Sequence, residues 1–115
     1  MDRERLKNIA DFYNHQEKDY PPLGGRKVVC GVVINNKEKA IKIMEDKKAI
    51  VKHQSKHQIV WKINDEEWIW VADWGASCKG RRFYKVIIDQ DIDKYIFNYL
   101  IQPRLANYCC SFEVV

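Results

Sequence analysis

The segment at residues 27–34, with the sequence KVVCGVVI, constrains the fold more than any other part of the chain. It is apolar and β-branched throughout, without the alternation of a strand that has one face in water. We therefore predict a strand that is covered on both faces. Asn35 and Asn36 end this strand, and residues 37–47 return to helical spacing. A strand, a short loop and a helix open a βαβ unit, so we expect an α/β protein.

The other elements follow from the same reasoning. Residues 2–18 have the spacing of an amphipathic helix, with Asp2 as its N-cap. Ile50 and Val51 are expected to start a short strand, and the polar residues after them form an exposed loop or edge. The remaining expected elements are a hairpin of strands 59–63 and 68–74 turning at residues 64–67, a strand at 83–88, a helix that Asp91 or Asp93 caps and Pro103 closes, and a last strand at 108–115.

These elements predict one α/β (α+β) domain over residues 1–115. Residues 1–20 hold the N-terminal helix, and residues 26–115 form the sheet core. We expect three helices and a mixed, mostly antiparallel sheet of about five strands.

Hydropathy and cysteine content indicate where the protein works. No apolar run approaches the ~20 residues that span a bilayer, and the N-terminal residues are too charged for a signal peptide. The four cysteines form no CxxC pair and no zinc-finger spacing, so free thiols in a reducing compartment are expected. We predict a cytoplasmic protein, in the cytosol of a host cell, with no membrane partner and no metal.

Charge is unevenly distributed along the chain, which carries +4 overall. Residues 26–62 carry ten basic and three acidic groups, and residues 76–88 have a net charge of +4. The acidic residues 63–75 lie between these two basic blocks. After folding, the blocks could converge into a surface that attracts the phosphates of a nucleotide or a nucleic acid. Alternatively, the lysines of residues 37–48 form the solvated face of one helix.

The stretch at residues 77–90, SCKGRRFYKVIIDQ, carries a family resemblance. Its apolar strand, which ends in Asp89, resembles the Walker B element of P-loop ATPases, in which the aspartate holds Mg²⁺. The serine and the basic-Gly-basic turn before that strand are similar to the corresponding region of the large-subunit ATPases of phage terminases. The likeness extends over roughly residues 27–115 in the order and pattern of the elements. It implies a nucleotide-binding α/β fold of a phage-type protein.

Two departures from that family indicate that the chain does not hydrolyse ATP. The sequence has no G-x-x-x-x-G-K-[ST] loop, so the β- and γ-phosphates have neither a backbone cradle nor a lysine. Gln90 takes the place of the glutamate that orients the attacking water, and an amide cannot accept its proton. We therefore expect no enzymatic activity, no catalytic residue and no cofactor. His53 and His57 have the spacing of zinc ligands on a helix but are expected in an exposed loop.

The residues that remain point to binding of a phosphate-containing small molecule. Lys79, Arg81 and Arg82 lie in a glycine-containing loop, where guanidinium and backbone N–H groups can hold phosphate. Aromatic side chains near them can stack on a base. The expected binding residues are Lys79, Arg81, Arg82, Trp74, Tyr84, Asp89 and Arg104. For the alternating tryptophans Trp68 and Trp70 the alternative is a place in the core.

Three functions remain open at this point. The first is a non-enzymatic phage protein that sequesters a nucleotide or cyclic-nucleotide-like immune signal, by analogy with small anti-defence sponge proteins, which commonly form homo-oligomers. The second is a nucleic-acid-binding accessory protein of phage packaging or replication, which would use the two basic blocks. The third is an inhibitor of a host protein that docks through the acidic hairpin or the N-terminal helix. We favour the first and expect a homo-oligomer.

Overall fold

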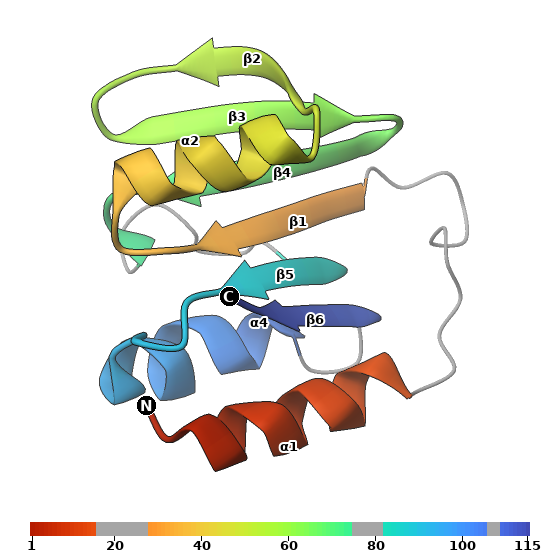
Figure 1. Cartoon of the computed structure of the whole chain (residues 1–115), viewed down its shortest axis with the longest axis vertical. Coiled ribbons are helices and arrows are strands. Elements are labelled where there is room, and N and C mark those ends of the chain that lie inside the picture. The colour runs from red at the N-terminus through yellow and green to blue at the C-terminus, as the bar shows by residue number, and fades with distance from the viewer. Residues whose placement is uncertain (16–27, 75–81, 106–108) are drawn as a thin grey trace.

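The computed structural model describes residues 1–15, 28–74, 82–105 and 109–115 as one sheet with helices on its two faces (Figure 1). In chain order the elements are α1 (Arg3–Asn14), β1 (Val28–Val33), α2 (Lys37–Asp46), β2 (Ile50–Gln54), β3 (Gln58–Ile63), β4 (Glu66–Val71), β5 (Lys85–Ile88), η1 (Ile96–Ile101), α4 (Gln102–Leu105) and β6 (Ser111–Val114). The segment η1 is a π-helix that continues directly into α4. No helix in these ranges is both long and apolar enough to cross a membrane.

The sheet has the strand order β2-β3-β4-β1-β5-β6. The expected α/β class, with a mixed sheet of about this size, is confirmed. The antiparallel pairings are β2 with β3 and β3 with β4, whereas β1 is parallel to both β4 and β5, and β5 is parallel to β6. More of the neighbouring strands therefore pair in parallel than the sequence predicted. The reason is that β1 lies in the middle of the sheet with a parallel strand on each side.

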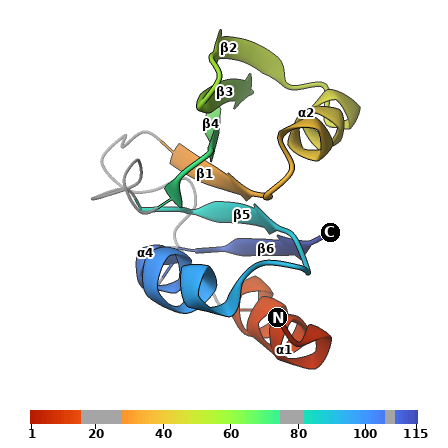
Figure 2. The same ribbon diagram turned by 90° about the vertical axis from the view of Figure 1, so that its left-hand side faces the viewer.

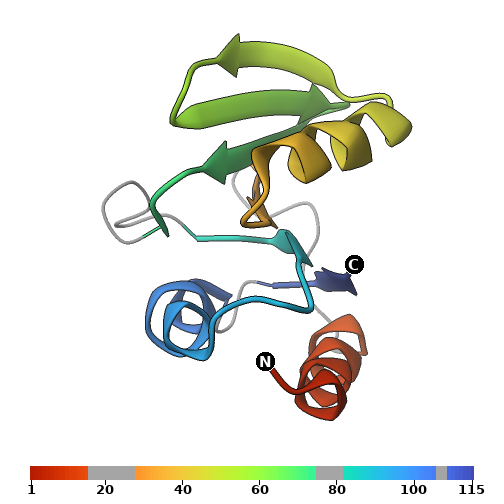
Figure 3. The same cartoon turned by 60° about the vertical axis from the view of Figure 1, so that its left-hand side comes forward.

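Two hydrophobic clusters lie on the two faces of this sheet. The helix α2 covers one cluster, which includes Cys30, Trp68 and Trp70. The helix α1 and the η1–α4 helix cover the other, which includes Ile69 and Val71 (Figures 2 and 3). Adjacent residues of β4 thus point into opposite clusters, as strand geometry requires. The prediction that the first strand is covered on both faces is confirmed.

The two edges of the sheet differ in how they end. On the β6 edge, the side-chain amide of Asn14 donates to the C=O of Phe112 over 3.0 Å and accepts from its N–H over 2.7 Å. This side chain takes the place of one rung of a further strand, so α1 closes that edge. Within the described ranges the β2 edge has no such cover, and all five residues of β2 are exposed.

Three local details refine the expected elements. Asp2 accepts from the N–H of Glu4 as the N-cap of α1, which ends at Asn14 rather than at residue 18. The side chain of Asp93, one of two candidate caps, accepts from the N–H groups of Tyr95 and Ile96. The β3–β4 turn contains only residues 64 and 65, and β4 begins earlier than predicted.

Pro103 does not close the C-terminal helix, because α4 runs through it to Leu105. A proline inside an α-helix normally clashes with the carbonyl four residues earlier. Here the preceding turns are π-helical, and the N–H of Gln102 donates to the C=O of Phe97, five residues back. We attribute the tolerance of Pro103 to this wider winding.

Candidate functional site

The candidate site lies where the parallel strands β1, β4 and β5 end. Their registers place the last residues of all three at the same edge of the sheet. The chain leaves β1 into α2 on one face and leaves β5 towards η1 on the other. Open α/β sheets bind ligands at such a point, where neighbouring connections depart in opposite directions, because side chains there leave a crevice at the sheet edge. The carboxyl edge beside β1 is therefore where a ligand site is expected.

A pocket of about 140 Å³ opens at this edge, over the ends of β1 and β4. Ile34 and Asn35 line it from the end of β1, Asp73 and Trp74 from the segment after β4, and Ile96 and Leu100 from the π-helix. The wide winding of η1 thus contributes directly to the wall of the pocket, in keeping with the frequent location of π-helical turns at functional sites.

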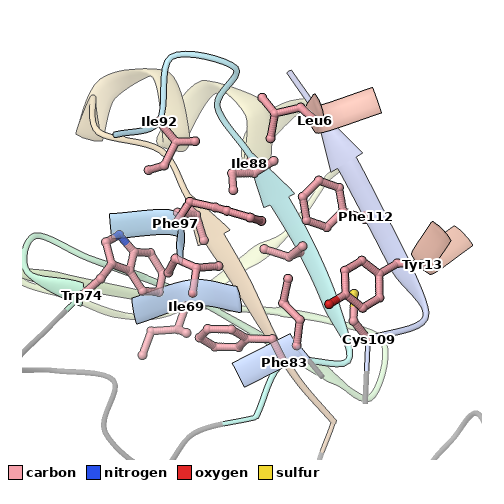
Figure 4. Close-up of a cluster of buried hydrophobic side chains, with 14 of the residues drawn as sticks. Leu6, Tyr13, Ile69, Trp74, Phe83, Ile88, Ile92, Phe97, Cys109 and Phe112 are labelled. Carbon is pink, nitrogen blue, oxygen red and sulfur yellow. The ribbon is translucent and has the colours of Figure 1, made fainter. Parts of the chain in front are cut away.

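Trp74 forms the boundary between this pocket and the core. Its side chain is only 5% exposed, and its ring meets that of Phe83 edge-on, with centroids 5.9 Å apart. Figure 4 shows Trp74 at the margin of the buried cluster. A ring held this firmly presents a rigid apolar surface to the pocket, which is suited to contact with a planar group.

Asp89 follows β5 at the same edge and is 6% exposed. Its N–H donates to the C=O of Val33, its Oδ2 lies 3.2 Å from the Nζ of Lys39, and its Oδ1 accepts from the N–H of Asp91. Both carboxylate oxygens therefore have partners within the protein. Among the residues described here, no three His, Cys, Asp or Glu side chains gather as metal ligands. The carboxylate of Asp89 fixes the end of β5 to the first turn of α2.

The N-terminus of α2 brings positive charge to this edge. Asn36 caps the helix by accepting from the N–H of Lys39, whose side chain remains 42% exposed beside Asp89. The Nζ of Lys37 donates to the C=O of Ser55 over 2.9 Å and lies 5.9 Å from the ring centroid of Trp70. Two lysines and the positive end of the helix dipole therefore lie next to the pocket, since Asn35 lines it and directly precedes Asn36.

The binding residues predicted from sequence do not form one group. Trp74 lines the pocket and Asp89 lies at the same edge. Arg82, Tyr84 and Arg104 lie near the opposite end of β5, where the N–H of Phe83 donates to the C=O of Arg104 and that of Tyr84 to the C=O of Val29. Five residues of extended chain, roughly 16 Å, separate residues 84 and 89. Lys79 and Arg81 lie outside the described residues.

Sequence reasoning missed Lys37, Lys39, Ile96 and Leu100 as site residues. The two lysines have the pattern of a solvated helix face, and the two apolar residues have that of a core. One signal was available, because a buried strand followed by two asparagines and a helix places that helix N-terminus at the carboxyl edge of the sheet.

Cys30, His53 and His57 do not come together in one site. Cys30 is fully buried, and burial raises its pKa to about 12, so its thiol stays protonated at neutral pH. His53 lies on the exposed strand β2 and His57 in the turn that follows it. Cys78 lies outside the described residues.

No family model matches this chain, and comparison with curated proteins and with solved structures returns no match.

Proposed function

We propose that this protein is a non-enzymatic binder of a phosphate-containing small molecule, of the nucleotide class, held at the carboxyl edge of its sheet. The proposal rests on two features of the structure that lie side by side. A small pocket of mixed polar and apolar lining, bounded by the ring of Trp74, lies beside a helix N-terminus that carries Lys37 and Lys39. Nucleotides combine a planar apolar base with anionic phosphates, so they match both halves of this arrangement.

The size of the pocket limits how the ligand sits. At about 140 Å³ it is smaller than the ~300–1,000 Å³ of clefts that enclose a drug-sized ligand. One ring system enters, therefore, and the remainder of the ligand extends over the sheet edge. The side chain of Lys39, which is 42% exposed and paired with Asp89, and the N-terminus of α2 are the groups at this edge that would attract phosphate.

Asp89 has a structural role at this edge. Its two oxygens contact Lys39 and the N–H of Asp91, so this carboxylate holds the end of β5 to the first turn of α2. Sequestration of a nucleotide signal, the role favoured from the sequence, requires only binding. Any contribution of Arg82 and Arg104 would have to come from the opposite end of β5.

A pair of tryptophan substitutions on one helix tests the proposal. Leu100→Trp fills the pocket, whereas Tyr99→Trp adds a similar ring at a neighbouring side chain that is 66% exposed. Purified protein is examined by mass spectrometry for co-eluting nucleotide, and by calorimetric titration with ADP-ribose and cyclic dinucleotides. We expect L100W to lose binding by at least about tenfold, which is about 1.4 kcal/mol, and Y99W to bind like the parent.

Two outcomes contradict the proposal. One is a protein that carries no nucleotide and binds none of the panel. The other is equal affinity of the parent and L100W, which would place the ligand elsewhere. Far-UV circular dichroism of both variants confirms that the fold is retained.

A further inference from the structure

The strand β2 leaves one edge of the sheet open. It is hydrogen-bonded to β3 alone and is the first strand in the sheet order. Figures 1–3 show it at the end of the sheet away from α1 and β6, with no described element beyond it. An edge strand presents a row of backbone N–H and C=O groups that can pair with another extended chain. The opposite edge is closed by Asn14, so the difference between the edges is built into the fold.

The open edge also exposes apolar side chains. Ile50 is 67% exposed and Val51 is 51% exposed. Val51 is opposite Trp61 and Ile50 is opposite Lys62, so the two point to opposite faces of the sheet. An incoming strand would meet an apolar side chain on each face.

The segment around β2 is strongly basic. Residues 47–57 include four lysines and two histidines and no acidic residue. Lys47 pairs with Glu113 over 3.1 Å. By contrast, Lys48, Lys52 and Lys56 form no ion pair with any residue in the described ranges. The charge at this edge is therefore available to a partner.

Lys48 lies just before this strand in an unusual backbone conformation. It follows the C-cap of α2 and has a φ of 58°, in the left-handed region that favours glycine. Glycine would adopt this conformation without strain, and a lysine adopts it only at a conformational cost. A cationic side chain stands at a position where the backbone favours glycine, two residues before β2 begins.

We propose that the open edge of β2 binds an extended segment of a partner protein in which acidic and β-branched side chains alternate. Backbone pairing would give the affinity, and the lysines would select acidic side chains. This inference does not depend on the proposed nucleotide site, which lies at the carboxyl ends of β1 and β4.

A second copy of this chain fits the same edge less well. Two β2 strands side by side would bring their lysines together without any acidic residue between them. Like charges that face each other across such a pairing repel, so the lysines oppose pairing between identical edges. An acidic partner turns the same lysines into favourable contacts.

The probe is a nine-residue synthetic peptide that alternates glutamate and valine, and its control has lysine in place of glutamate. Binding is followed by amide chemical shifts and by hydrogen exchange of the whole chain. We expect the acidic peptide to shift and protect the amides of β2, and the lysine peptide to do neither. Lys52→Glu should weaken binding by roughly tenfold, whereas Lys42→Glu, the same change on α2, should leave it unchanged.

Two substitutions to glycine test whether Lys48 contributes to binding or only to the fold. Asn64, in the β3–β4 turn, is the other described non-glycine residue with positive φ, at 53°. Lys48→Gly and Asn64→Gly both relieve backbone strain, so neither should destabilise the fold. We expect only K48G to weaken the acidic peptide, by about threefold or more.

Four results would overturn the proposal. The first is an absence of β2 shifts at millimolar acidic peptide, and the second is equal binding of the two peptides. The third is protection of β2 that rises with protein concentration alone, which would make a second copy the occupant. The fourth is a β2 response to a single-stranded oligonucleotide but not to the peptide, which would make this edge a nucleic-acid surface.

Discussion

Replacing Asn14 with alanine tests whether one side chain closes the β6 edge of the sheet. The side-chain amide makes two hydrogen bonds with the backbone of Phe112, at 2.7 and 3.0 Å. Alanine removes both partners and leaves the N–H and C=O of Phe112 at an open edge. The C-terminal end of α1 also loses a direct connection to β6.

The expected loss follows from these two bonds. A neutral hydrogen bond contributes about 0.5–1.5 kcal/mol net, so Asn14→Ala should remove about 1–3 kcal/mol from the free energy of unfolding. The higher helix propensity of alanine offsets up to about 0.5 kcal/mol of this, and less than that at the last residue of a helix. With a urea m-value of about 1–2 kcal/mol per molar, the unfolding midpoint should fall by about 1 M.

Asn8→Ala is the matched control, because Asn8 is an exposed residue of the same helix and makes no hydrogen bond with the described residues through its side chain. It removes the same atoms and gains the same propensity, so its midpoint should stay level or rise slightly. Equilibrium urea unfolding, followed by tryptophan fluorescence, measures both variants. Equal midpoints for N14A and N8A would refute the reasoning, since the bonds to Phe112 would then contribute nothing.

Further predictions concern the core of the sheet. Trp70→Phe should cost about 1–2 kcal/mol more than Trp68→Phe in urea unfolding, because the buried Nε1–H of Trp70 donates to a backbone C=O over 2.7 Å, whereas that of Trp68 has no partner in the described residues. Gly31→Ala should lower the free energy of unfolding by about 1–3 kcal/mol in the same urea experiment, because its Cβ would lie 3.3 Å from the buried ring of Phe83. Burial raises the pKa of Cys30 from 9.0 to about 12, so above pH 9 the unfolded chain releases a proton that the folded chain keeps. Stability should therefore fall between pH 9 and 12, by about 1.4 kcal/mol at pH 10, and the parent should lose more stability than Cys30→Ala between pH 8 and pH 10.

The fold class was predictable because the strongest signals are local. An unbroken apolar run identified β1, and the period-two pattern of β4 placed Trp68 and Trp70 on one face and Ile69 and Val71 on the other. Both patterns report how a strand is buried, and burial is a property of each residue's own surroundings. They needed no knowledge of which strands are neighbours.

The pairing directions required information that is not local. β1 and β4 are adjacent and parallel, although α2, β2 and β3 lie between them in the chain. A burial pattern is the same whether the neighbouring strand runs parallel or antiparallel. The β3–β4 hairpin was therefore identified, whereas the parallel share of the sheet was underestimated.

The sequence alone was enough to show that some of the predicted binding residues could not share one site. Once residues 83–88 are assigned to a strand, the groups before and after it must lie at opposite ends of that strand. Arg82 and Asp89 are close in sequence but cannot share one small ligand through a straight β5. Residues on either side of a strand are close in sequence but far apart in space.

The contact between Lys39 and Asp89 could not be obtained in this way, because fifty residues separate the two side chains. Helical periodicity identifies which side of α2 meets the core, and on that criterion Lys39 belongs to the solvated face. It does not say which end of the helix meets the sheet edge. Only the parallel arrangement of β1 and β5 brings the first turn of α2 to the residue that follows β5. In a sheet of this kind, binding residues are therefore to be sought where parallel strands end together, however far apart they lie in the chain.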